Sequence, residues 1–340
     1  MKMKKFIHAG YLAGFAGLWI FSGPLLGAAE TSGKCPVAPG PAAAAKPAVK
    51  VPPTAADLPY GPEKRQVLDF WQAESDRPTP LVIYIHPGGW IRGDKAEVTH
   101  VEKYLAAGIS VVSINYRFVW EAREAGVQPP VRWPLHDAAR ALQFVRSRAA
   151  AWKVDPVRIG ATGDSAGSFA GLWLAFRRDL ADPAAADPVA RESTRLWCVA
   201  VSGAQTTLDP RLMKEWMPNS FYGGHAFGII KEPVFNDMGD PEACLAQREK
   251  LLPWIEEFSP HSLATAAAPP VYLYYRAAPA LGEVRDDPTH SANFGVELQE
   301  KLRAAGVECE LVYPGAPDIR HAQPVDFLIG KLGRSEAVQR

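Results

Sequence analysis

The sequence predicts an α/β fold in which a mostly parallel sheet is covered by helices on both faces. Two observations lead to this prediction. Short, β-branched apolar runs recur along the chain, and helical patterns separate them. Strands buried on both faces of a parallel sheet have this continuous apolar character. The alternation of strand and helix is typical of βαβ units, which place helices on both sides of the sheet.

Six short apolar runs are the predicted strands. Ligand sites in such folds gather at the carboxyl ends of the strands, so a motif that directly follows a strand carries extra weight. The runs are residues 81–85, 111–114, 158–162, 198–201, 271–275 and 310–313.

Helical periodicity occupies the segments between these runs. One helix is expected within residues 135–152, and another ends at Gly306, since glycine commonly follows the last turn of a helix. The apolar stripes are Ala138, Ala141, Leu142 and Val145 in the first helix, and Phe294, Leu298, Leu302 and Ala305 in the second.

The N-terminal region is expected to lie outside the folded domain. Lysines open the chain, an apolar run covers residues 6–26, and small residues precede Glu30. This predicts a secretory signal peptide over residues 1–29, with an uncleaved membrane anchor as the alternative. Residues 30–57 are rich in alanine and proline and are expected to form an extended tether. The folded domain is expected over residues 58–334.

Charge and cysteine content exclude several classes of function. Lysine plus arginine equals aspartate plus glutamate at 37 residues each. The chain therefore has no basic surplus for nucleic acid or for an anionic membrane. Cys35 lies in the tether and Cys244 in a polar segment. Cys198 and Cys309 lie in apolar or strand-like runs and are expected to be buried free thiols rather than disulfide partners.

The segment Gly163-Asp164-Ser165-Ala166-Gly167 follows a predicted strand and precedes a helical run. This is the G-x-S-x-G pattern of a nucleophile elbow in its strand–turn–helix context. A serine at so sharp a turn has a strained backbone, and flanking glycines avoid collisions with neighbouring groups. The turn presents the hydroxyl at the positive end of the next helix. Ser165 is therefore the predicted nucleophile.

A second motif, His86-Pro87-Gly88-Gly89-Trp90, directly follows the strand that ends at Ile85. Acyl transfer needs N–H donors for the oxyanion of the tetrahedral intermediate, and glycines let the backbone approach closely. The predicted donors are the N–H groups of Gly88, Gly89 and Ala166. An ordinary Pro-Gly turn is the simpler interpretation of this segment alone. The elbow downstream favours the oxyanion interpretation.

From about residue 60 to residue 332 the chain resembles the α/β-hydrolase esterases. It is most similar to the group of hormone-sensitive lipase and of bacterial carboxylesterases such as acetylxylan and feruloyl esterases. This group usually has a glycine where the chain has Pro87, and often one where it has Ser168. Pro87 removes one backbone donor. The matching segments are 68–70, 86–90, 93–95, 114–117, 133–137, 155–159 and the elbow.

The resemblance implies that an acid and then a histidine follow the serine. The histidine of this group lies in a loop after the last strand, which selects His321 beyond Tyr313-Pro314-Gly315. The acid lies in an acid–Pro loop before the helix that ends at Gly306, which selects Asp287. Asp286 is adjacent and stays open as the alternative.

Residues 203–269 form an expected cap insertion with many aromatic side chains. Trp90, Trp216 and Tyr222 are the predicted substrate-binding residues, because aromatic walls suit sugar rings, phenolic groups and lipophilic acyl groups. Core packing is an equally good interpretation of each residue alone. No metal-binding motif is present, so we expect neither metal nor cofactor.

These observations predict a secreted or periplasmic serine carboxylesterase with a Ser-His-Asp triad and an acyl-enzyme intermediate. Its expected substrates are small-molecule or polysaccharide esters, with short acyl groups favoured by the resemblance. No nucleic acid is expected as a partner, and no stable membrane association after signal cleavage. The alternatives are a non-catalytic binding protein on the same fold and, with less support, a serine peptidase.

Overall fold

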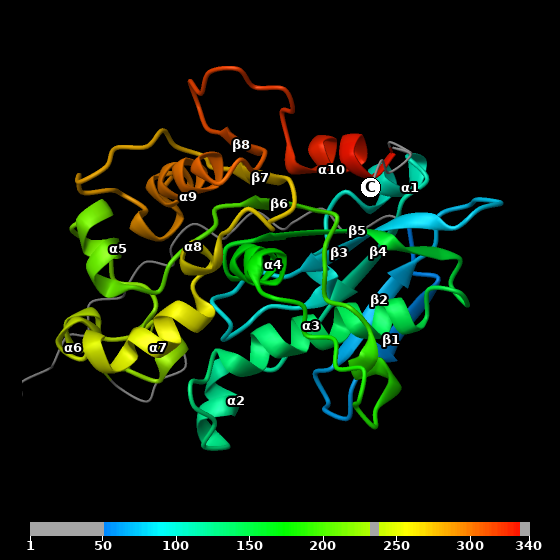
Figure 1. Ribbon diagram of the computed structural model, residues 1–340, viewed down its shortest axis with the longest axis horizontal. Coiled ribbons are helices and arrows are strands. Elements are labelled where there is room, and N and C mark those ends of the chain that lie inside the picture. Colours follow the sequence, from blue (N-terminus) through cyan, green and yellow to red (C-terminus); the bar gives the residue numbers. More distant parts are fainter. Residues whose placement is uncertain (1–50, 232–237, 334–340) are drawn as a thin grey trace, which may run out of the picture. The chain divides into compact units, whose positions relative to one another are not determined.

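The computed structural model describes residues 51–231 and 238–333, and within them it contains an eight-stranded, mostly parallel sheet (Figure 1). The strand order is β1-β2-β4-β3-β5-β6-β7-β8. β1 and β2 pair antiparallel, as do β2 and β4, and every other neighbouring pair is parallel. The strands are β1 (Ala55–Pro59), β2 (Val67–Trp71), β3 (Thr79–Ile85), β4 (Ser110–Ile114), β5 (Val154–Asp164), β6 (Cys198–Ser202), β7 (Val271–Tyr274) and β8 (Cys309–Val312).

The predicted fold class and strands are confirmed. The signal-peptide prediction and most of the tether lie outside the described residues. β1 begins at Ala55, ahead of the domain start expected at residue 58, because it pairs with β2 at the edge of the sheet. The last residues of the expected tether therefore belong to the sheet.

Helices cover the two faces of the sheet and bury a separate apolar layer on each. The bounds are α1 (Val101–Ala106), α2 (Val119–Glu124), α3 (Arg132–Ser147), α4 (Ala166–Phe176), α5 (Pro210–Trp216), α6 (Pro241–Ala246), α7 (Arg248–Phe258), α8 (Pro260–Leu263), α9 (Asn293–Ala304) and α10 (Pro324–Gly333). Short 3-10 helices are η1 (Lys95–Glu97), η2 (Pro188–Arg191), η3 (Gly224–Phe227) and η4 (Pro288–His290).

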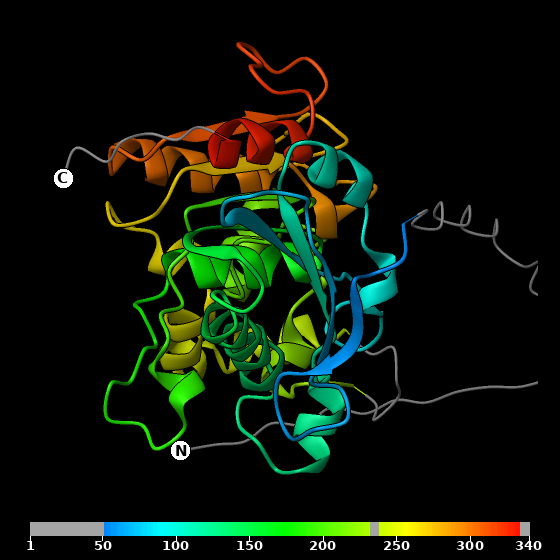
Figure 2. The ribbon, with the colours of Figure 1, turned by 90° about the vertical axis from the view of Figure 1, so that its right-hand side faces the viewer.

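The side-chain alternation along β3 shows how the two layers divide. Leu81, Ile83 and Ile85 pack with α3, α4 and α9 on one face. Val82 and Tyr84 pack with α1 and α10 on the other. The views in Figures 1 and 2 agree that α1 and α10 lie side by side, and the two helices are in contact. A central strand buried on both faces explains the continuous apolar run in the sequence.

Two further predictions concern cysteines and helix ends. Cys198 and Cys309 are buried free thiols, as expected, and Cys244 is also buried and free. Burial raises the pKa of the Cys198 thiol to about 12, so it is not a reactive thiolate. Helix α9 ends just before Gly306, as predicted, and this glycine has a left-handed backbone with φ of 74°. None of the helices among the described residues is long and apolar enough to span a bilayer.

Candidate active site

The turn between β5 and α4 carries Ser165 at the carboxyl end of the central strand. Its backbone lies at φ 51° and ψ −118°, outside the regions that a serine prefers. The glycines around it are required by space. A Cβ on Gly163 would lie 2.6 Å from the carbonyl oxygen of Ile85, and a Cβ on Gly167 would lie 2.0 Å from the same atom. The turn therefore packs against the end of β3, where only glycine fits.

Ser168, which follows the elbow where related sequences often have glycine, has a structural task. Its side chain is buried, and its Oγ lies 2.8 Å from the carbonyl oxygen of Gly163 and 2.6 Å from that of Ser202. The N–H of Ser165 also donates to the carbonyl of Ser202, at 3.0 Å. The strained turn is thus tied to the end of the neighbouring strand β6.

The hydroxyl of Ser165 meets a histidine. The distance from Ser165 Oγ to His290 Nε2 is 2.9 Å, and His290 Nδ1 lies 2.8 Å from Asp287 Oδ2. Asp287 Oδ1 also accepts the backbone N–H of His290 at 3.2 Å. The order serine, imidazole, carboxylate is the geometry of a catalytic triad.

One short turn presents both the histidine and the acid. Asp287 is the N-cap of η4, Pro288 is its first residue, and His290 is its last. The cap bond to the N–H three residues on brings the imidazole back over the carboxylate. Both side chains are partly open to solvent, with 40% of His290 and 63% of Asp287 exposed.

The prediction that His321 supplies the imidazole needs correction. The structure does not bring His321 to Ser165. Instead, His321 Nδ1 lies 2.8 Å from Glu310 Oε2, and its backbone N–H donates to Glu310 Oε1 at 2.8 Å. Its carbonyl accepts the hydroxyl of Tyr272, whose side chain packs on the α10 face of the sheet. The loop after β8 is therefore fastened to that face by Glu310.

Sequence reasoning missed His290, although a local signal was present. An aspartate followed by proline predicts a capped turn, and the residue three positions after the cap lies beside the cap side chain. That reasoning applied to Asp287 would have selected His290. The resemblance instead directed attention to the loop after the last strand. Asp286 lines the same cavity as Asp287, and it is Asp287 that contacts the imidazole.

The loop after β3 holds the predicted oxyanion donors. Gly88 has φ of 116° and Gly89 has φ of 62°, and a Cβ on Gly88 would lie 2.2 Å from the carbonyl oxygen of Arg92. Gly88 accepts the N–H groups of Ile91 and Arg92, which closes the loop into a tight turn. In the described part of the chain, no residue accepts a hydrogen bond from the N–H of Gly88 or Gly89.

His86 holds the start of this loop. Its ring is fully buried, stacks on Tyr116 with centroids 4.1 Å apart, and has Nδ1 2.7 Å from the carbonyl oxygen of Pro87. Burial lowers the pKa of His86 to about 4, so the neutral ring donates from Nδ1. Pro87 thus supplies an acceptor that fixes the loop, although it lacks an N–H.

An ion-pair cluster anchors the far end of the same loop. The Lys95 ammonium lies 2.8 Å from Asp69 on β2 and 3.0 Å from Asp57 on β1. The backbone N–H of Lys95 donates to Asn115 Oδ1, and Asn115 Nδ2 donates to Asp94. The loop of residues 86–95, called the oxyanion loop below, is therefore tied to strands β1 and β2 and to the end of β4.

Two cavities meet at Ser165 and His290. One, of about 440 Å³, extends along Tyr274, Arg276 and Arg285. The other, of about 450 Å³, extends along Gly88, Gly89 and Met238. Together they open the site toward two separate parts of a substrate.

The three aromatic residues predicted to bind substrate lie in the core and line neither cavity. Trp90 is 0% exposed, Trp216 5% and Tyr222 2%. Trp90 packs against Phe169 and Tyr222, and Trp216 packs against Phe294. The prediction of substrate contacts from these rings is therefore wrong, and core packing accounts for them.

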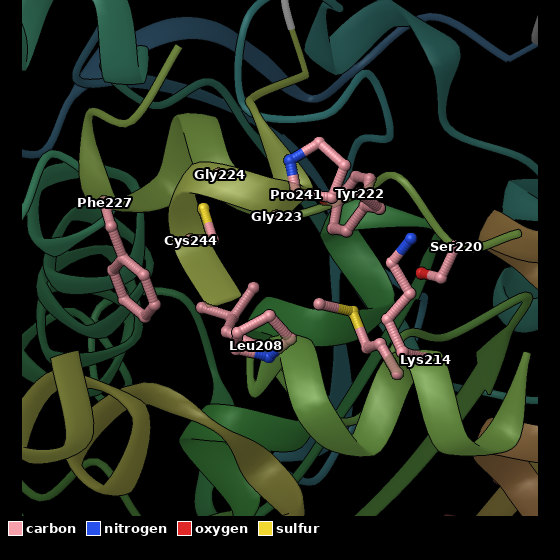
Figure 3. Close-up of a pocket in the computed structure, with 11 residues that line it drawn as sticks. Leu208, Lys214, Ser220, Tyr222, Gly223, Gly224, Phe227, Pro241 and Cys244 are labelled. Atoms are coloured by element: carbon pink, nitrogen blue, oxygen red, sulfur yellow. The ribbon is translucent and has the colours of Figure 1, made fainter. Parts of the chain in front are cut away.

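Residues 203–231 and 238–269 of the expected cap contain η3 and helices α5 to α8 (Figure 1). His225 in this segment has Nε2 2.9 Å from the carbonyl oxygen of Gly89, so the segment contacts the oxyanion loop. Figure 3 shows a cavity within it, lined by Leu208, Tyr222 and Cys244 among others. That cavity measures about 10 Å³, which is room for one water molecule, and it does not reach Ser165.

Helix α4 adds its dipole to the site, because its N-terminus begins at Ala166 and points at the serine. In the ranges 51–231 and 238–333, no three His, Cys, Asp or Glu side chains gather in a way that holds a metal ion.

Comparison with known proteins finds esterases. Residues 68–194 match the BD-FAE family model. Esterase LipQ of Mycobacterium tuberculosis is 32% identical over 136 residues, which are 38% of this chain and 30% of that protein. Carboxylesterase NlhH of the same organism is 24% identical over 274 residues, which are 80% of this chain and 74% of that protein. The chain thus spans less than a third of LipQ and about three quarters of NlhH.

Solved structures share the fold. A truncated carbohydrate esterase from gut microbiota has a TM-score of 0.60 at 18% identity, covering 85% of this chain and 100% of that chain. The acetyl ester-xyloside bifunctional hydrolase of Caldicellulosiruptor lactoaceticus has a TM-score of 0.56 at 22% identity, covering 80% and 89%.

The sheet order, with β2 antiparallel to β1 and β4 and a serine turn after β5, is that of the α/β-hydrolase fold. Within that class, the chain is similar to esterases. It matches the BD-FAE family model over residues 68–194 and is similar to carboxylesterase NlhH over most of its length.

Proposed function

We propose that the chain is a serine carboxylesterase that uses Ser165, His290 and Asp287 as its catalytic triad. The observation that carries the proposal is the 2.9 Å hydrogen bond between Ser165 Oγ and His290 Nε2, formed at the tip of the strained elbow. The carboxylesterase relatives support the same reaction class.

The geometry supports the following steps. His290 Nε2 accepts the proton of Ser165 as Oγ attacks the ester carbonyl, and Asp287 stabilises the imidazolium and fixes its orientation. The N–H groups of Gly88, Gly89 and Ala166 stabilise the oxyanion. His290 then protonates the departing alcohol. Water, deprotonated by His290, hydrolyses the acyl-enzyme and restores Ser165.

The substrates we propose are esters with short acyl groups, carbohydrate esters included. Two cavities of about 440 and 450 Å³ adjoin the serine, so both sides of the ester bond have room. A carbohydrate esterase and an acetyl ester-xyloside hydrolase share the fold. The N-terminal pattern of lysines, apolar run and small residues supports export, and mass spectrometry of the periplasmic or secreted protein tests it by locating the mature N-terminus.

The first experiment compares hydrolysis of 4-nitrophenyl acetate by wild type, Ser165→Ala, His290→Ala and His321→Ala. We expect the Ser165 and His290 variants to lose 10³-fold or more in kcat/KM, as is typical of triad members. His321→Ala serves as the matched control, because its imidazole contacts Glu310 rather than the serine.

If His321→Ala loses the activity and His290→Ala keeps it, the proposed triad is wrong. If wild type and Ser165→Ala are equally slow on a panel of acetyl, butyryl and feruloyl esters, the fold serves binding rather than catalysis.

A further inference from the structure

Two arginines line the cavity of about 440 Å³ that contains Ser165 and His290. Arg276 lies just beyond the carboxyl end of β7, and Arg285 lies just ahead of the Asp286-Asp287 pair. The triad mechanism uses neither of them. Their guanidinium groups are the positive charges of the arginine side chains on this wall, and the reaction itself gives them no role.

Arg285 is held in place by neutral groups. Its backbone N–H donates to Asn219 Oδ1 at 3.1 Å, and its carbonyl accepts from Asn219 Nδ2 at 2.7 Å. One terminal nitrogen of its guanidinium donates to the carbonyl of Ala278 at 2.8 Å. The side chain is therefore positioned without having its charge neutralised.

Neither arginine forms an ion pair with a carboxylate in the described ranges 51–231 and 238–333. Other arginines of the domain do: Arg117 binds Asp137 at 2.7 Å and Arg248 binds Asp209 at 2.6 Å. A guanidinium matches a carboxylate in a planar, two-pronged arrangement that adds geometric specificity to charge. Arg276 and Arg285 keep this capacity at the wall of the reaction cavity.

The described carboxylates on the same wall form no ion pair with these arginines. Asp287 is engaged by His290 at 2.8 Å, and Asp164 has interactions of its own. Asp286 lines the cavity, and no ion pair joins it to either arginine. A carboxylate on the ligand would give the two guanidinium groups the ion-pair partner that no described residue of the wall supplies, and a neutral, hydroxyl-rich ligand would not.

We propose that the natural ester carries a carboxylate in the part that occupies this cavity, and that Arg276 and Arg285 bind it. The proposal rests on the proposed esterase function and narrows its substrate class. The carboxylate has two possible sources: the acid, as in a half-ester of a dicarboxylic acid, and the alcohol, as in a uronic acid or a hydroxybenzoic acid.

Two matched ester pairs distinguish the sources. The acid side is probed with 4-nitrophenyl hemisuccinate against 4-nitrophenyl methyl succinate. The alcohol side is probed with 4-acetoxybenzoate against methyl 4-acetoxybenzoate. In one pair we expect wild type to favour the charged ester, and we expect Arg276→Met or Arg285→Met to lower the charged-to-neutral ratio of kcat/KM by about 10- to 100-fold.

Two further variants sharpen the comparison. Asp286→Asn removes from the wall a negative charge that would repel the carboxylate of the ester, so it should raise the charged-to-neutral ratio of kcat/KM. Arg178→Met is the control for a lost positive charge: it follows the carboxyl end of α4, an 11-residue helix, so it lies about 16 Å along the helix from Ser165. Its ratio should equal that of wild type.

An unchanged ratio in both arginine variants, for both ester pairs, overturns the proposal. So does an equal fall in Arg178→Met. If no ester is hydrolysed at all, the esterase function fails, and calorimetric binding of 4-hydroxybenzoate and succinate still tests the arginines. Binding by wild type that Arg276→Met abolishes supports the carboxylate site, and equal binding, or none by wild type, counts against it.

Discussion

Ser165 has a backbone conformation that residues other than glycine adopt only at a cost in free energy. Hydrogen bonds around the turn offset the cost of this conformation. The backbone N–H of Ser165 donates to the carbonyl of Ser202, and the neighbouring Ser168 Oγ is hydrogen-bonded to two backbone carbonyls. Strain of this kind costs roughly 1–3 kcal/mol and gathers at active sites. Ser165 is thereby held at the start of α4, where it lines both cavities.

A pair of inactive variants measures this strain. Ser165→Gly and Ser165→Ala both lack the hydroxyl, and they differ mainly in how well they tolerate φ of 51°. We expect the glycine variant to have a free energy of unfolding about 1–2 kcal/mol higher than the alanine variant. Urea denaturation followed by circular dichroism gives both values. Equal stabilities would mean that the turn relaxes in the variants.

The oxyanion loop should be equally sensitive at Gly88. A Cβ there would lie 2.2 Å from the Arg92 carbonyl oxygen, so Gly88→Ala displaces the loop and its donors. We expect kcat for 4-nitrophenyl acetate to fall about 10²- to 10³-fold with the fold retained. Gly108→Ala is the control, since Gly108 also has positive φ but no neighbour within 4 Å of its Cβ. A comparable activity loss in the control would assign the effect to stability.

At this scale, sequence reasoning identified residues whose roles depend on near neighbours in the chain. The glycines beside Ser165 and the pair Gly88-Gly89 fall in this group. His290 was missed because the resemblance directed attention to the loop after the last strand, although the capped turn at Asp287 was a local signal for it. The local pattern does not specify that this turn lies beside the elbow, which is a tertiary contact. The buried rings of Trp90 and Trp216 were misassigned because a residue type does not reveal which way its side chain faces.

Helix α4 shows how one element joins the site to the core. All its residues are buried, and it packs on β3, β5 and β6. Two of its glycines differ sharply. A Cβ on Gly167 would collide with the Ile85 carbonyl at 2.0 Å, whereas a Cβ on Gly171 would meet side chains at 3.6 Å, an ordinary contact.

We therefore expect opposite effects from two alanine substitutions on this helix. Gly171→Ala should raise the free energy of unfolding by about 0.5–1 kcal/mol, because alanine favours the helix more than glycine does. Gly167→Ala should lower it and reduce esterase activity, since backbone must move. Thermal melts and the acetate assay report both. Similar outcomes for the two variants would contradict the packing described for the elbow.

The loop after β8 is held by a buried carboxylate. Burial by itself raises the pKa of Glu310, but hydrogen bonds from His321 and from the backbone of Arg320 outweigh it and hold the pKa below its usual value. A lowered carboxylate pKa means that the unfolded chain takes up protons first as the pH falls. The stabilisation from Glu310 is present at neutral pH and is lost in acid.

Replacing this carboxylate should loosen the loop without stopping the chemistry. We expect Glu310→Gln to lower the free energy of unfolding by about 1–3 kcal/mol at pH 7, with the difference shrinking as the pH falls toward 4. Hydrogen exchange should localise the change to residues 313–323. A loss confined to kcat, with unchanged stability, would instead point to a catalytic role for this pair.

On the scale of the whole molecule, buried histidines govern the response to acid. Burial lowers the pKa of His86, His136 and His261 to about 4 each. The unfolded chain protonates these groups near pH 6.5, well before the folded chain does. The free energy of unfolding should therefore fall as the pH drops from about 6.5 to 4.

We expect each of these histidines to remove about 2 kcal/mol between pH 8 and pH 5. His136 suits a test because it lies beside the Trp173 ring and is remote from the triad contacts. His136→Phe should lose about 2 kcal/mol less than wild type over this interval, measured by urea denaturation at each pH. The same pH dependence in both proteins would show that His136 is not a neutral buried group.

The whole-molecule architecture was the most predictable level. Strands such as 81–85 are buried on both faces, and burial on both faces requires a continuous apolar run, which can be recognised in the sequence. The edge of the sheet was harder to predict: no residue of β1 is buried, and its first residues, 55–57, fall within the predicted tether. Its place in the sheet depends on pairing with β2, and pairing is a property of two segments.

The proposed triad has three groups, and two of them belong to the same turn. Because Asp287 and His290 belong to one capped turn, their mutual geometry does not depend on how the sheet flexes. The alignment of the His290 imidazole with Ser165 then depends only on how the turn after β7 lies relative to the elbow after β5. The segment beyond β8 holds the histidine in related sequences, but here it supplies no group to the proposed triad. Loop grafts, length changes or fusions there become an engineering route that leaves the chemical machinery untouched.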